Sequence, residues 1–123
     1  MNLLKILLAE DDPFNQFIIQ KVVKDAGFML DVVENGQIAI NKLQEQDYDL
    51  VLMDVEMPVM NGYEATSYIR EHLGPKSNIP IIMVTSFVGL QEAAKCLLLG
   101  ANTYLAKPFK SEELLEEIAT LVV

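Results

Sequence analysis

Short apolar runs recur along the chain, and each is followed by a longer segment in which apolar residues repeat with the period of a helix. The first run, residues 5–9 (KILLA), is apolar at consecutive positions rather than at every second one. Such continuous runs are typical of strands that are buried on both faces. We predict five strands of this kind, at residues 5–9, 29–33, 49–53, 81–84 and 103–106.

The segment after the first run has the features of an amphipathic helix. Asp12 can cap the helix, Pro13 suits its first turn, and Gly27 ends it. The apolar residues in between repeat every four positions and form one stripe: Phe14, Ile18, Val22 and Ala26. Four further helices are predicted at residues 37–46, 63–73 and 90–99 and in a C-terminal segment capped by Ser111.

This alternation predicts a doubly wound α/β fold, in which a five-stranded parallel sheet carries helices on both faces. We expect a single domain at residues 1–123, because the chain has the size of one typical domain and no linker or change in composition divides it. In open parallel sheets, ligands bind at the carboxyl ends of the strands. The residues that directly follow each strand are therefore the candidates for function.

The charge balance narrows the choice of partners. A formal net charge of −9 disfavours direct binding to nucleic acid or to an anionic membrane, and it favours a cationic protein surface or a divalent metal. The longest uncharged run, residues 77–91, contains Pro80 and is too short for a membrane span. Cys96 is the single cysteine and is expected in the core. With no signal-peptide pattern at the start, we predict a cytoplasmic location without membrane insertion.

Acidic residues follow two of the predicted strands. Glu10 and Asp11 come after the first run, and Asp54 follows the third. Thr85 follows the fourth run and Lys107 the fifth. If the first and third strands are neighbours, the three carboxylates converge with a summed charge of −3, which the lysine reduces to −2. A bound Mg²⁺ would neutralise this cluster, and Mg²⁺ prefers hard oxygen ligands, so we predict a magnesium site.

The same residues suit phosphoryl transfer. A carboxylate can attack phosphorus to give an aspartyl phosphate, and the reaction needs little beyond alignment and neutralisation of the phosphoryl oxygens. Asp54 is the predicted nucleophile because it stands alone after a central strand, whereas Glu10 and Asp11 are adjacent and suited to hold metal. Lys107 and the Thr85 hydroxyl are predicted to neutralise the phosphoryl oxygens.

Four sequence blocks, in this order and spacing, resemble the receiver domain of two-component response regulators. They are spread over nearly the whole chain: ILLAEDDPFN, VLMDVEMPVMNGYEA, IIMVTS and GANTYLAKPF. The resemblance implies a flavodoxin-like sheet with strand order 2-1-3-4-5 and five helices. The Asp12…Asn15 run, with NGYEA and GANTYLAKP, is more similar to receivers of hybrid sensor histidine kinases than to those of transcription factors.

The resemblance also implies a role for each candidate residue. Asp54 accepts a phosphoryl group from a phosphohistidine on a sensor histidine kinase or a histidine phosphotransfer protein. Lys107 pairs with that phosphoryl group, ahead of a cis peptide bond at Pro108. Mg²⁺ has four protein ligands: Glu10, Asp11, Asp54 and the backbone carbonyl of Glu56.

A further implication is a change of state after phosphorylation. Thr85 and Tyr104 rearrange together, and the face formed by the fourth helix, fifth strand and fifth helix changes its preference for partners. Glu56 and Phe87 flank the path of the water that removes the phosphoryl group. Such a chain is a signalling switch rather than an enzyme, although it assists its own phosphoryl transfer and autodephosphorylation.

Other classes of protein fit these residues less well, but one alternative stays open. A haloacid dehalogenase-type phosphohydrolase places its nucleophilic aspartate after the first strand, whereas Asp54 follows the third. A P-loop nucleotidase needs G-x-x-x-x-G-K-[ST], which the sequence lacks. The open alternative is a protein-interaction module of the same fold that works without phosphorylation.

Overall fold

In the part of the chain that the structure describes, strands and helices alternate as the apolar pattern predicts. The computed structural model describes residues 3–86 and 89–122. Its strands are β1 (Lys5–Ala9), β2 (Met29–Val33), β3 (Leu50–Asp54), β4 (Ile81–Thr85) and β5 (Thr103–Ala106). Its α-helices are α1 (Pro13–Asp25), α2 (Gly36–Glu45), α3 (Gly62–His72), α4 (Leu90–Leu98) and α5 (Ser111–Leu121), and a short 3-10 helix, Gly74–Lys76, follows α3.

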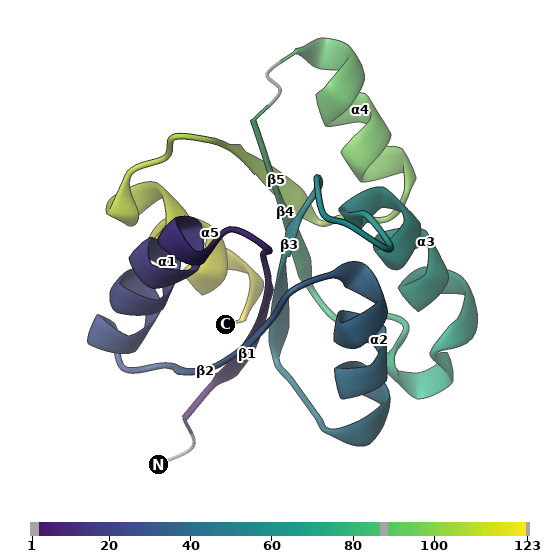
Figure 1. Cartoon of the computed structure of the whole chain (residues 1–123), viewed down its shortest axis with the longest axis horizontal. Helices are drawn as coiled ribbons and strands as arrows, with labels where there is room; N and C mark the ends of the chain where they lie inside the picture. Colours follow the sequence, from purple (N-terminus) through teal and green to yellow (C-terminus); the bar gives the residue numbers. More distant parts are fainter. Residues whose placement is uncertain (1–2, 87–88, 123) are drawn as a thin grey trace.

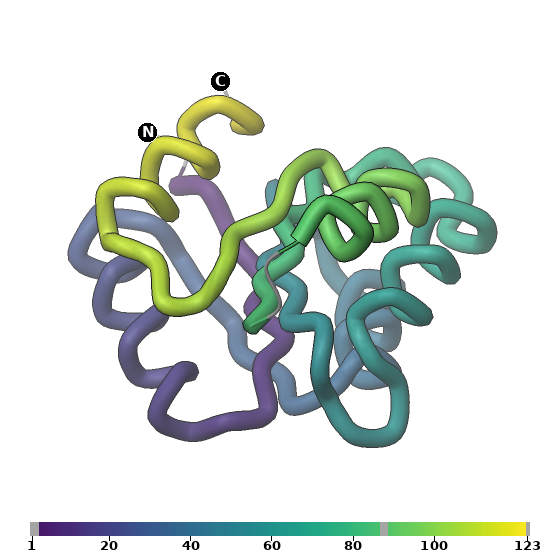
Figure 2. The backbone as a smooth tube through the Cα atoms, turned by 90° about the horizontal axis from the view of Figure 1, so that it is seen from above, coloured from purple at the N-terminus to yellow at the C-terminus, as the bar shows by residue number. Residues whose placement is uncertain are grey.

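The five strands form one parallel sheet in the order β2-β1-β3-β4-β5. This confirms both the predicted fold class and the strand order that the resemblance implied. Helices α1 and α5 cover one face of the sheet, and α2, α3 and α4 lie on the other side (Figure 1). The view from above shows the same two groups of helices on either side of the strands (Figure 2). None of the described helices has the length and apolar character that crossing a membrane requires.

The sheet contributes to a hydrophobic core on each face. In β1, Leu7 and Ala9 belong to the core formed with α2, α3 and α4, while Ile6 and Leu8 belong to the core formed with α1 and α5. None of these four side chains is more than 1% exposed. The prediction of a strand buried on both faces is therefore confirmed for β1. Cys96 of α4 is also fully buried, as expected.

Helix α1 begins where the sequence predicts, but its most buried residues differ from the predicted stripe, of which Val22 is partly buried and packs against the core. Asp12 caps the helix and accepts a hydrogen bond from a backbone amide of the first turn. The buried residues of α1 are Ile19 and Val23, whereas Phe14 and Ile18 of the predicted stripe are 69% and 41% exposed. The helix carries more apolar residues than the sheet can cover, so the predicted stripe begins on its outer side.

Several boundaries differ from the prediction by one residue. Lys110, not Ser111, occupies the N-cap position of α5, because the Glu113 carboxylate accepts a hydrogen bond from the Lys110 amide at 2.9 Å. Strands β3 and β4 each extend one residue further than predicted, so Asp54 and Thr85 are their last residues. Both residues still pair in register with the neighbouring strand.

Thr66 of α3 is fully buried, and within the described residues its hydroxyl has no hydrogen-bond partner. A buried polar group in this position costs about 1–3 kcal/mol of stability. Thr66→Val keeps the shape of the side chain and removes the hydroxyl, so we expect the free energy of unfolding to rise by about 1 kcal/mol in urea denaturation. Thr120→Val is the matched control, because Thr120 is an exposed residue of α5 whose hydroxyl donates to the Glu116 carbonyl at 2.9 Å. A loss of stability in Thr66→Val would contradict the prediction.

Candidate metal and phosphoryl-acceptor site

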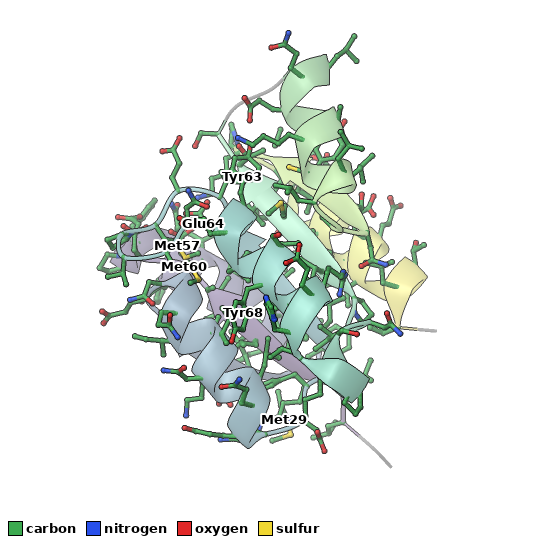
Figure 3. The ribbon with its side chains drawn as sticks, turned by 90° about the vertical axis from the view of Figure 1, so that its right-hand side faces the viewer. Met29, Met57, Met60, Tyr63, Glu64 and Tyr68 are labelled. Carbon is green, nitrogen blue, oxygen red and sulfur yellow. The ribbon has the colours of Figure 1, made fainter. Side chains whose placement is uncertain are left out.

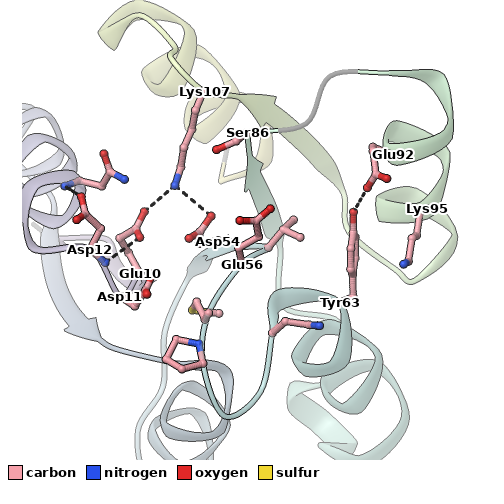
Figure 4. A pocket seen from close by; sticks show the side chains of 15 residues that line it. Glu10, Asp11, Asp12, Asp54, Glu56, Tyr63, Ser86, Glu92, Lys95 and Lys107 are labelled. Carbon is pink, nitrogen blue, oxygen red and sulfur yellow. Dashed lines mark hydrogen bonds and ion pairs between the residues drawn. The ribbon is translucent and has the colours of Figure 1, made fainter.

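Three carboxylates meet at the carboxyl ends of β1 and β3. The two strands are neighbours, with Ala9 opposite Met53, so Glu10 and Asp54 leave the sheet side by side. One carboxylate oxygen from each of Glu10, Asp11 and Asp54 lies within 4.8 Å of the other two. The structure thus brings the three predicted acids together (Figure 4).

The acids differ in their exposure to solvent. Glu10 and Asp54 are only 1% and 5% exposed, whereas Asp11 is exposed. The position of Glu10 is fixed by two hydrogen bonds from the start of α1. The Gln16 side chain donates to its carbonyl at 2.6 Å, and the Asp12 amide donates to its Oε2 at 3.1 Å. Two nearly buried carboxylates require a cation close by, because an isolated buried charge is strongly disfavoured.

Lys107 supplies one such cation from the end of β5. Its amide donates to the Thr85 carbonyl at 2.7 Å, so β4 holds the residue next to the site. The ammonium lies 2.9 Å from Glu10 Oε1 and 3.1 Å from Asp54 Oδ1, and Figure 4 marks both contacts. The Lys107–Pro108 peptide bond is cis, as the resemblance implied.

The electrostatics of the cluster follow from this geometry. Burial raises the pKa of Asp54 to about 7, and the charge of Glu10 adds to the rise, while Lys107 opposes it. Burial alone would lower the pKa of Lys107, but the hydrogen bonds and charges of Glu10 and Asp54 hold it above its ordinary value. One ammonium therefore does not compensate both buried carboxylates, as the sequence-based charge argument anticipated.

A cavity of about 890 Å³ opens over the cluster. Its formal charge is −4, because six acids and two lysines line it: Glu10, Asp11, Asp12, Asp54, Glu56, Glu92, Lys95 and Lys107. An anion would be repelled here without a further cation. Hard carboxylate oxygens at this density suit a small divalent metal such as Mg²⁺.

The loop from β3 to α3 is packed directly against the end of β3. The Gly62 amide donates to the Val55 carbonyl at 2.8 Å, and a Cβ on Gly62 would lie 2.2 Å from the Asp54 carbonyl oxygen. Only glycine allows this approach. Within the loop, the Met60 amide donates to the Pro58 carbonyl at 2.7 Å, and Val59, which lies between them, has a φ of 70°. Figure 3 shows Met57 and Met60 in this loop beside the start of α3.

Not every predicted residue lies on the cavity wall. Glu56 lines the cavity, but Thr85 is 1% exposed at the end of β4, and the next residue, Ser86, lines it instead. Tyr104 is 39% exposed on β5 and is not among the residues around the cavity. Phe87 lies outside the described residues.

Among the residues that line the same cavity, sequence reasoning did not single out Tyr63, Glu92 and Lys95. Tyr63 lies within the block VLMDVEMPVMNGYEA, which resembles the receiver family as a whole and does not mark Tyr63 in particular. No local pattern distinguishes Glu92 and Lys95 from ordinary solvated helix residues. Their contact depends on how α3 and α4 are placed, which spacing along the chain does not reveal.

The fold and the site together define a class of protein, the flavodoxin-like domains with a lysine-paired acidic cluster at the carboxyl ends of the central strands. The chain belongs to the response regulator receiver domain family, whose family model matches residues 6–119. It is 40% identical over 121 residues to hybrid signal transduction histidine kinase B of Dictyostelium discoideum. That match covers 90% of this chain but only 6% of the kinase, and it agrees with the predicted likeness to hybrid-kinase receivers.

Two solved structures are similar over nearly the whole chain. One is the receiver domain of sensor histidine kinase PA1611 from Pseudomonas aeruginosa, which has a magnesium ion in its active site cleft. It shares 36% identity, with a TM-score of 0.90 and 98% coverage of both chains. The other is the complex of the Saccharomyces cerevisiae phosphotransfer protein Ypd1 with the receiver domain of Ssk1, at 27% identity, a TM-score of 0.91, and coverage of 98% and 89%.

Proposed function

We propose that this receiver domain is a phosphorylation-dependent switch in which Asp54 accepts a phosphoryl group from a phosphohistidine. The observation that carries the proposal is the meeting of three carboxylates within 4.8 Å at a site that also holds the Lys107 ammonium. An Asp54 oxygen attacks phosphorus, the bond from phosphorus to the donor imidazole breaks, and the imidazole regains its electron pair. Lys107, already 3.1 Å from Asp54 Oδ1, then pairs with the new phosphoryl oxygens.

Magnesium is the proposed cofactor. Glu10, Asp11, Asp54 and the backbone carbonyl of Glu56 would hold it, and the formal charge of −4 around the cavity favours a dication there. When bound, the ion neutralises phosphoryl oxygens during transfer. The PA1611 receiver domain, which has magnesium in its cleft, supports the choice of metal by similarity.

The proposed output is a change in the face formed by α4, β5 and α5. Thr85 hydrogen-bonds the phosphoryl group, and Tyr104, which is 39% exposed on β5, reorients with it. Glu56, on the cavity wall, is placed to influence autodephosphorylation by water. These roles make the domain a signalling switch that assists its own chemistry, not a separate enzyme.

The proposed phosphodonor is a sensor histidine kinase or a histidine phosphotransfer protein. Such a donor must bring its phosphohistidine to Asp54, and an apolar surface lies beside the site. Phe14, Phe17 and Ile18 of α1 are 69%, 66% and 41% exposed, and a cavity of about 420 Å³ runs from α1 to Lys107. A cluster of large, exposed apolar side chains favours contact with another protein. The Ypd1–Ssk1 complex provides a precedent for this type of pairing.

The proposed unit is one receiver domain at residues 1–123 that works in the cytoplasm, where its phosphodonors act. The chain matches only 6% of the length of its Dictyostelium relative. The proposed chemistry needs only the residues of this domain and a phosphodonor.

Acetyl phosphate with Mg²⁺ tests the function directly. We expect the intact mass to rise by about 80 Da, the mass of one phosphoryl group on an aspartate, and the increment to disappear in excess EDTA. Asp54→Asn is expected to gain no mass, because an amide does not attack phosphorus. Equal labelling of the wild type and Asp54→Asn would refute the assignment of the acceptor. A wild type that stays unmodified would favour an interaction module that works without phosphorylation.

A further inference from the structure

Tyr63 connects helix α3 to helix α4 through three contacts. Its hydroxyl donates to the Glu92 carboxylate, and the Lys95 ammonium lies 4.2 Å from the centre of its ring (Figure 4). The thiol of buried Cys96 is a further neighbour of the hydroxyl. Burial and the contact with Glu92 raise the pKa of Tyr63 above its ordinary value. One side chain of α3 thus contacts three residues of α4.

The backbone of Tyr63 is tied to the acceptor strand. It directly follows Gly62, which packs on the Asp54 carbonyl and donates to Val55. A capping box fixes the same turn, since Asn61 Oδ1 accepts from the Glu64 amide at 2.9 Å and the Glu64 carboxylate accepts from the Asn61 amide at 3.1 Å. The segment from Asp54 to Tyr63 is therefore short and held by backbone contacts at both ends.

Helix α4, in contrast, has little packing of its own. Cys96 is its only buried residue, while Leu90 and Leu98 are 90% and 86% exposed. A helix that buries so little apolar surface gains little stability from the core. Helix α4 also packs against β5, and the contacts with Tyr63 add a second attachment, to α3.

We propose that Tyr63 is a positioning residue that couples the acceptor site to helix α4, with Glu92 and Lys95 as its partners on that helix. This inference rests on the proposed function only for its second part, the transmission of phosphorylation to α4. Its first part, that Tyr63 holds α4 in place, applies to the unphosphorylated protein. The two parts can be measured separately.

Hydrogen exchange tests the first part. In Tyr63→Phe, which keeps the ring and loses the hydroxyl, we expect the α4 amides at residues 90–98 to exchange about tenfold faster than in the wild type, as for loss of a hydrogen bond to a charged group. Exchange in α5 should not change. Tyr68→Phe is the matched control, because Tyr68 lies further along α3 (Figure 3), and it should exchange like the wild type. Wild-type exchange of α4 in Tyr63→Phe would overturn the proposal.

Acetyl phosphate with Mg²⁺ tests the second part in the same variants. In the wild type, we expect phosphorylation to change the exchange of α4. In Tyr63→Phe, Asp54 should still be phosphorylated. The change in α4 exchange on phosphorylation should fall to about half of the wild-type change or less, because one of a few coupling contacts has been removed. Full phosphorylation of Tyr63→Phe with a full α4 response would refute the coupling. Absence of phosphorylation in the wild type would instead refute the proposed function.

Glu92→Gln provides an independent variant that leaves α3 unchanged. It keeps a hydrogen-bond acceptor for the Tyr63 hydroxyl but loses the charge, so α4 exchange should lie between those of the wild type and Tyr63→Phe. The same substitution at Glu116, an exposed residue of α5, is the control. Faster α4 exchange in the control than in Glu92→Gln would contradict a specific role for this contact.

Discussion

In metal-free buffer at about pH 8, Asp54→Asn is expected to be more stable than the wild type by roughly 4 kcal/mol, and at about pH 4 the two proteins should be nearly equal. The cause is the rise in the pKa of Asp54 from 3.8 to about 7, which follows mainly from burial and then from the charge of Glu10. The folded protein therefore binds a proton that the unfolded chain releases between these pH values. Stability falls as the pH rises through this window, because ionising the buried carboxylate costs free energy. Asparagine avoids this cost since it stays neutral.

Urea denaturation in EDTA between about pH 4 and pH 8, followed by circular dichroism, measures the effect. Asp31→Asn is a matched control of opposite sign, since the hydrogen bond from Tyr48, at 2.6 Å, and the charge of Lys5 lower the pKa of Asp31. That variant should lose stability at neutral pH rather than gain it. Saturating Mg²⁺ should reduce the advantage of Asp54→Asn, because the ionised carboxylate then has a ligand. A wild type whose stability is independent of pH between 4 and 7 would contradict the prediction.

The sequence predicted the strands well because burial on both faces leaves a continuous apolar run. It also predicted which acids meet, since the carboxyl ends of parallel strands lie at one edge of the sheet and Glu10, Asp11 and Asp54 all follow such ends. The sheet order came from the resemblance, because the apolar runs alone do not distinguish one neighbour from another. The strands and the acids at their ends were predictable because both depend on patterns that are local to each strand.

Features that depend on contacts between elements were not predictable in the same way. The predicted stripe of α1 matches the face that packs on the sheet only in part, at Val22, because the helix has apolar residues on more than one side and packing selects Ile19 and Val23 as the buried ones. The contact between Tyr63 and Glu92 joins residues 29 positions apart on different helices. No periodicity in either helix indicates it.

Lys107→Met is expected to have the second large effect. The Lys107 ammonium lies 2.9 Å from Glu10 and 3.1 Å from Asp54, whose carboxylates are almost completely buried. Methionine keeps much of the length of the side chain but leaves these two carboxylates without that cation. Removing one partner of a buried ion pair costs about 3–5 kcal/mol, so the free energy of unfolding in EDTA at about pH 8 should fall by a similar amount. Lys21→Met is the matched control, because its ion pair with Asp25 at 3.3 Å is exposed, and exposed pairs contribute little.

Metal and phosphorylation should respond to Lys107→Met in opposite directions. Mg²⁺ should raise the melting temperature of the variant more than that of the wild type, because no ammonium competes with the ion for Glu10 and Asp54. Phosphorylation by acetyl phosphate should nevertheless slow by about a hundredfold, the typical cost of removing one preorganised electrostatic contact to the reacting group. Thermal melts with and without Mg²⁺, together with the rate of mass gain, separate the two effects. A variant that binds Mg²⁺ more weakly than the wild type would show that Lys107 helps to build the metal site, since a cation that only competes with Mg²⁺ could not have that effect.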